Sequence, residues 1–161
     1  MINLGQASFF SAGAVGVPGD RRFYIQLETD TTTRWFLCEK AQVQALADAG
    51  LELLGRNDLA DSGSGDAAGF APPGDVVWRV GQIAIEFNDS TSLLEVVLVP
   101  VDDEAEAVQF EITPNLMGAM AAEALEAVTA GRPACPRCGL AMDPEGHRCP
   151  TTNGDLRGHQ P

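Results

Sequence analysis

The sequence predicts an α+β fold with one mostly antiparallel sheet, or two related sheets, with helices packed on one face, and a small zinc-binding tail. Short stretches of alternating polarity come in two groups of three, and each group is followed by a stretch with helical periodicity. A cluster of cysteines near the C-terminus predicts the tail. We therefore expect an α+β domain over residues 1–130 and a zinc-knuckle tail over residues 131–161.

The first half of the domain, about residues 1–55, contains three predicted strands, over residues 8–16, 22–28 and 34–38. In the middle strand Phe23, Ile25 and Leu27 alternate with residues of the opposite face, which is the two-residue period of a strand. The turn before it contains Pro and Gly, the residues that tight turns favour.

A helix is predicted over residues 40–54, because apolar residues recur there at helical spacing. Gly50 falls on the same stripe, and a glycine inside a helix costs roughly 1 kcal/mol relative to alanine. It could instead end the helix as a C-terminal cap, but the leucines beyond it favour continuation to Gly55. The stripe comprises Val43, Leu46, Ala47, Leu53 and Leu54.

The second half, about residues 76–130, repeats the order, with strands predicted over residues 76–87, 93–101 and 107–112 and a helix over 114–130. Residues 93–99 are apolar on both faces apart from one glutamate, which is typical of a central strand. Thr113 can cap the helix, and Pro114 suits its first position. The repeated strand-strand-strand-helix order suggests an internal duplication.

Residues 56–75 between the halves are rich in Gly, Ala, Asp and Ser, and predict an acidic loop without periodicity. A calcium loop over residues 61–66 is an alternative, although the spacing does not match an EF-hand.

The tail contains the pattern C-x2-C-x8-H-x-C, and we predict a metal site formed by Cys135, Cys138, His147 and Cys149. Three thiolates and one imidazole are a common ligand set for one structural zinc ion, and Gly139 permits the tight turn of the knuckle. Four protein ligands would leave no open position for catalysis. His159 is an alternative nitrogen ligand.

Composition favours some classes of protein and argues against others. The formal net charge is −13, with a single lysine and scattered arginines, which argues against nucleic-acid binding. No apolar run reaches the roughly 18 residues of a membrane helix, and the N-terminus lacks the features of a signal peptide. We therefore expect a cytoplasmic protein that does not bind membranes.

Catalytic motifs are not found. The only histidines are His147 and His159, both in the tail, so the main domain has no Ser-His or Cys-His pair. Cys38 stands alone and is interpreted as a small buried hydrophobic residue. A polar pocket could form if four charged residues converge, although such residues more often pair on a surface or cap helices. These residues are Arg21, Glu39, Lys40 and Arg79.

These features favour a non-enzymatic protein-interaction or adaptor module with a structural zinc ion. The alternatives are a small-molecule-binding protein or enzyme that uses the polar pocket, and a zinc-knuckle protein that binds nucleic acid. The acidic charge disfavours the last of these.

Several segments resemble an uncharacterised, actinobacterial-type family, the domain of unknown function number 3090. They are residues 12–26, 39–43, 79–81, 131–139, 143–150 and 153–154, which include the CPxCG and GHxCP motifs of the tail. The chain departs from the family pattern after Pro150, where Thr151 stands in place of a basic residue. The resemblance implies a zinc tail and no established activity. It also implies a shared pathway or a complex with a histidine-phosphatase-like protein, because genes of the family are often found beside the gene of such a protein.

Overall fold

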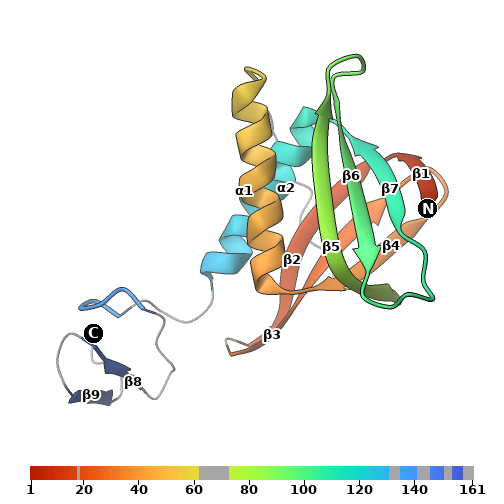
Figure 1. Ribbon diagram of the computed structural model, residues 1–161. Helices are drawn as coiled ribbons and strands as arrows, with labels where there is room; N and C mark the ends of the chain where they lie inside the picture. The colour runs from red at the N-terminus through yellow and green to blue at the C-terminus, as the bar shows by residue number, and fades with distance from the viewer. Residues whose placement is uncertain (18, 62–72, 131–134, 141–145, 151–153, 158–161) are drawn as a thin grey trace.

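A computed structural model describes residues 1–17, 19–61, 73–130, 135–140, 146–150 and 154–157, with the side chains of 146–148 and 154–157 excepted. Two helices lie side by side against a curved sheet (Figure 1). Among the described residues, no helix is long and apolar enough to cross a membrane. The strands are β1 (Ile2–Gln6), β2 (Phe9–Val17), β3 (Asp20–Glu28), β4 (Thr33–Cys38), β5 (Val76–Asn88), β6 (Leu93–Pro100), β7 (Val108–Ile112), β8 (Gly146–Cys149) and β9 (Gly154–Arg157).

The predicted α+β class is confirmed. Seven strands form one sheet in the order β1-β7-β6-β5-β4-β3-β2, and β8 and β9 form a separate hairpin. Four of the six pairings in the large sheet are antiparallel, and two, β1 with β7 and β4 with β5, are parallel. Strands β2 to β4 precede helix α1 (Lys40–Arg56), and β5 to β7 precede helix α2 (Pro114–Thr129), which is the predicted repeated order. A duplication as the origin of this order stays a prediction.

The two edges of the sheet come together through the chain itself. Strands β1 and β2 lie at opposite ends of the strand order, yet only Ala7 and Ser8 separate them. The amide of Ala7 donates to the carbonyl of Glu111 on β7 at 2.8 Å, and the next amide, of Ser8, donates to Glu28 on β3 at 2.9 Å. Because this link is so short, the sheet curls and its two edge strands lie near each other in space. The rings of Phe10 and Phe110, 5.4 Å apart, pack across this closure.

Helix α1 runs through Gly50 and ends at Arg56, so continuation of the helix is confirmed and its predicted end differs by one or two residues. Gly50 is buried, and a Cβ atom built on it would lie 2.6 Å from Sδ of Met117 and 3.0 Å from Cγ. The two helices therefore cross closely at this glycine. In α2 the side chain of Thr113 accepts from the amide of Leu116 at 3.2 Å, as predicted for the cap.

Both faces of β3 are buried, whereas its alternating sequence predicted one apolar and one polar face. Tyr24 and Gln26 are covered in the same way as Ile25 and Leu27, because the curled sheet and the helices enclose the strand from both sides. Strand β1 was not predicted from the sequence. The predicted loop over residues 56–75, and the alternative calcium loop at 61–66, lie largely outside the described residues.

Candidate metal centre and polar cleft

Cys135 and Cys138 lie in a tight turn closed by two backbone hydrogen bonds. The amide of Gly139 donates to the carbonyl of Cys135 at 2.9 Å, and the amide of Cys135 donates to the carbonyl of Leu140 at 2.8 Å. Gly139 has a φ of +74°, a conformation that glycine adopts without the steric cost of a side chain. This local geometry holds the two thiols on one side of the turn, as a zinc knuckle requires.

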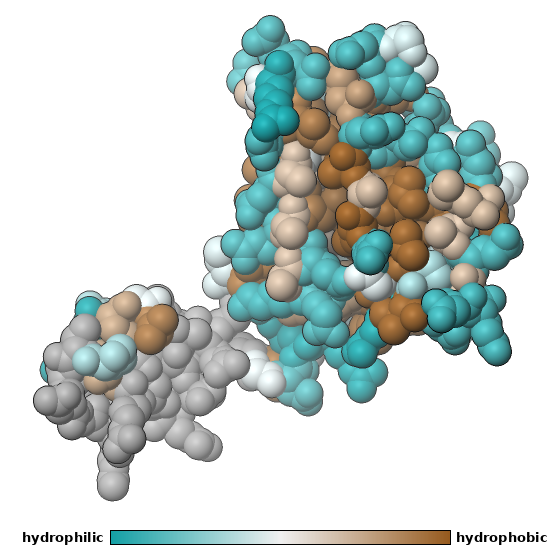
Figure 2. All heavy atoms as spheres, viewed as in Figure 1, coloured by the Kyte–Doolittle hydropathy of each residue, from teal (hydrophilic) through white to brown (hydrophobic). Residues whose placement is uncertain are grey.

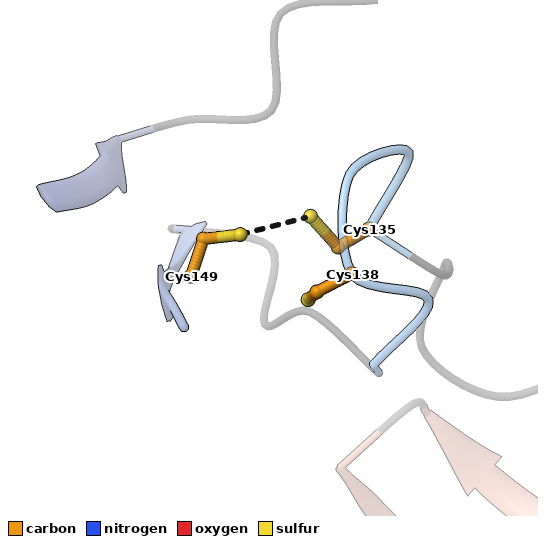
Figure 3. A group of neighbouring side chains, drawn as sticks. All are labelled: Cys135, Cys138 and Cys149. Atoms are coloured by element: carbon orange, nitrogen blue, oxygen red, sulfur yellow. Dashed lines mark hydrogen bonds between the residues drawn. The ribbon is translucent and has the colours of Figure 1, made fainter. Parts of the chain in front are cut away.

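Cys149 at the end of β8 completes a group of three thiols (Figure 3). Its sulfur accepts a hydrogen bond from the thiol of Cys135 at 3.9 Å, and all three sulfurs lie within 4.8 Å of one another. Cys135 and Cys149 are only 2 % and 1 % exposed, and Cys138 packs against them. None of the four cysteines, all of which lie in the described part of the chain, forms a disulfide. The group can therefore hold a metal ion.

Desolvation raises the pKa of the Cys138 thiol, and the neighbouring Cys135 and Cys149 raise it further, although a backbone hydrogen bond at Leu140 lowers it. Three thiolates packed this closely repel one another unless a cation lies among them. A divalent metal ion supplies that charge, because thiols that coordinate it lose their protons.

The predicted nitrogen ligand, His147, belongs to β8, two residues before Cys149, but its side chain lies outside the described residues. The side chain of Arg148 also lies outside the described residues, as does the whole of the alternative ligand His159. Arg137, the other arginine beside the cysteines, is exposed on the knuckle.

The structure places Cys38, the remaining cysteine, at the buried end of β4, where it is 4 % exposed. Burial, together with the charge of the adjacent Glu39, raises the pKa of this thiol from 9.0 to about 12. The thiolate needed by a nucleophile is therefore disfavoured at neutral pH. This agrees with its interpretation as a small hydrophobic residue.

The four charged residues considered for a polar pocket, Arg21, Glu39, Lys40 and Arg79, all line one cleft of about 400 Å³. Sequence reasoning overlooked Arg22, which also lines the cleft. Nη2 of Arg79 lies 3.4 Å from Oε1 of Glu39. This ion pair depends on the parallel pairing of β4 with β5, which sets Leu37 opposite Arg79.

A second, apolar groove of about 270 Å³ lies between α1 and β5. Hydrophobic side chains gather on this side of the molecule, over β5 and β6 (Figure 2). Patches of this kind on soluble proteins often mark interaction sites. The groove is lined by Gln42, Ala45, Leu46, Ala49, Ile83 and Ile85.

One protein family, described as "Protein of unknown function (DUF3090)", matches residues 3–149, which include the seven-stranded sheet apart from Ile2, both helices and all three clustered cysteines. No curated protein and no solved structure matches the chain.

Proposed function

Since this chain belongs to the DUF3090 family, whose description assigns no activity, we propose that it is a zinc-binding protein whose tail serves protein interaction rather than catalysis. One structural Zn²⁺ would bind to Cys135, Cys138, His147 and Cys149. The proposal is carried by the three thiol sulfurs that gather within 4.8 Å from two separate segments of the chain.

The distance between two of the sulfurs fits a tetrahedral zinc ion. Zinc binds thiolate sulfur at about 2.3 Å, so two sulfurs on one tetrahedral ion lie about 3.8 Å apart. Sγ of Cys135 and Sγ of Cys149 are 3.9 Å apart. This pair of thiols is thus spaced as a tetrahedral zinc ion would hold it, and the sulfur of Cys138 lies within 4.8 Å of both.

His147 is the proposed fourth ligand because of its position in β8. Alternate residues of a strand share a face, so positions 147 and 149 belong to the same face of β8. A set of three sulfurs and one nitrogen fills the coordination sphere of zinc, and a filled sphere is typical of structural sites. When bound, the ion would supply cross-linking between the knuckle and the β8–β9 hairpin.

The interaction role is supported by the exposed surface of the knuckle. Leu140 is 55 % exposed, although its backbone carbonyl is held by the amide of Cys135. A large apolar side chain on an ordered backbone costs a partner less conformational entropy than one on a flexible chain, because the backbone is already fixed. The exposed guanidinium of Arg137 lies in the same turn, and arginine is enriched at protein interfaces.

The first experiment is the metal content of the full-length protein, purified without added metal and measured by elemental mass spectrometry. We expect about one zinc ion per chain. A metal-free protein, or one that contains iron in place of zinc, would contradict the zinc assignment.

The interaction role is tested with the histidine-phosphatase-like protein that the family resemblance implies as a partner. We expect Leu140→Asp to weaken its binding about tenfold, because a charge would be buried where an apolar side chain packs. Val101→Asp is the matched control, since Val101 is 61 % exposed outside the tail. Equal binding by the two variants and the unmodified protein, measured by titration calorimetry, would remove the tail from the interface.

A further inference from the structure

The cleft beside the β4–α1 junction concentrates positive charge in an acidic protein. Four of the ten lysines and arginines of the chain, Arg21, Arg22, Lys40 and Arg79, line it, together with one acidic residue, Glu39. Four positive charges against one negative charge leave the cleft at +3, whereas the whole chain carries −13. A concave site lined by one sign of charge focuses the field and attracts ions of the opposite sign.

Two of the arginines are held in place by other groups. Nη1 of Arg21 donates to the carbonyl of Ala127 at 2.8 Å, near the C-terminal end of α2, and its guanidinium lies 5.1 Å from the centre of the Phe23 ring. Arg79 is paired with Glu39. A guanidinium has five N–H donors, so these contacts leave others for a ligand. Fixed donors lower the entropy that a ligand must overcome on binding.

Helix α1 adds to the positive potential. Lys40 is its first residue, and Glu39, at the cap, lines the same cleft. The N-terminus of a helix of this length carries about half a positive charge from the aligned peptide dipoles. The helix and the four cationic side chains therefore act on the same volume.

We infer that this cleft binds the phosphate group of a small phosphorylated molecule. A phosphate monoester carries a charge of about −1.5 to −2 and three strong acceptor oxygens, which suit several cationic donors. A single carboxylate would leave most of the positive charge unbalanced. A cleft of about 400 Å³ is within the size range of small-molecule sites. Longer polyanions such as nucleic acids would meet the repulsion of the acidic surface outside it.

The inference is tested by titration calorimetry of the full-length, zinc-loaded protein at low ionic strength, with inorganic phosphate and ribose 5-phosphate as probes. We expect saturable binding of both, with the ester at least as tight because the cleft also contacts the organic part. Arg79→Gln and Lys40→Gln should each weaken binding about five- to tenfold, as expected for the loss of a charged hydrogen bond. Arg79 is 57 % exposed, so its replacement leaves the core intact.

Arg56→Gln is the matched control. It removes the same charge, but Arg56 pairs with Glu52 at the far end of α1, away from the cleft. We expect this variant to bind within about twofold of the unmodified protein, since screening weakens distant surface charges. The inference would be overturned if neither probe bound saturably below about 10 mM. It would also be overturned if Arg56→Gln were as harmful as Arg79→Gln, or if ribose 5-phosphate failed to bind where phosphate did.

Discussion

Replacing Cys149 by serine is expected to abolish tight zinc binding and to unfold the tail while the seven-stranded sheet stays folded. Cys149 contributes the thiol that joins β8 to the knuckle. It is 1 % exposed and packs against Cys135. A structural zinc ion contributes on the order of 10 kcal/mol or more to the folding of a small domain. Few buried side chains are available to replace it, since the second buried cluster comprises cysteines alone among the described residues.

The measurement has two parts. Elemental analysis of Cys149→Ser should show loss of bound zinc, and amide hydrogen exchange should show lost protection in β8 and β9 together with unchanged protection in β2 to β7. Cys38→Ala is the matched control, because it also removes a buried thiol but lies outside the group of three. It should retain the metal. Retention of stoichiometric zinc by Cys149→Ser, or unfolding of the large sheet with the tail, would contradict the proposed independent tail.

The candidate metal centre could be predicted from the sequence because its cysteines lie close together along the chain. Two cysteines three residues apart and a following glycine specify one turn, and the turn brings the sulfurs to the same side. The third sulfur belongs to Cys149 at the end of β8, which is only eleven residues after Cys138 in the sequence. The role of His147 stays a prediction, because the position of its imidazole depends on side-chain geometry outside the described residues.

The strands were predictable where alternation was strong and not where pairing is distant. Strand β1 has only two large apolar residues, Ile2 and Leu4, and its partner β7 lies about a hundred residues away in the sequence. No local pattern reports such a pairing. The burial of Gln26 was missed for a related reason: it follows from the curled sheet and the helices that cover it, and the sheet curls because its edge strands β1 and β2, which are adjacent in sequence, pair with β7 and β3 at opposite edges.

The residues of the polar cleft could likewise be picked out from the local sequence, whereas their proximity in space depends on distant strand pairing. Its charged residues were noticeable from the sequence because they lie in or beside apolar strands. Their convergence required the parallel pairing of β4 with β5, which brings Arg79 next to Glu39 across forty residues. The sequence thus indicated which charged side chains to consider, and only the strand topology of the folded protein could show that they line one cleft.

The second large effect on stability is expected from a substitution where α1 and α2 cross. Gly50→Leu should lower the free energy of unfolding by about 3 kcal/mol, the upper part of the range for overpacked cores. Leucine is a better helix former than glycine by nearly 1 kcal/mol, so the helix itself opposes this loss. The added side chain would occupy the space of Met117, whose Sδ and Cγ lie 2.6 Å and 3.0 Å from the position of a Cβ atom.

Gly55→Leu is the matched control for this crossing. Gly55 lies in the same helix, and a Cβ atom there would meet nothing within 4 Å, so the variant should be neutral or up to about 1 kcal/mol more stable. Both variants are compared by urea unfolding of the full-length protein, followed by helical circular dichroism. In the Met117→Ala background the penalty of Gly50→Leu should fall by about 1–3 kcal/mol, the coupling expected for residues in contact. Equal stabilities of the two leucine variants would show that α1 and α2 do not cross at Gly50.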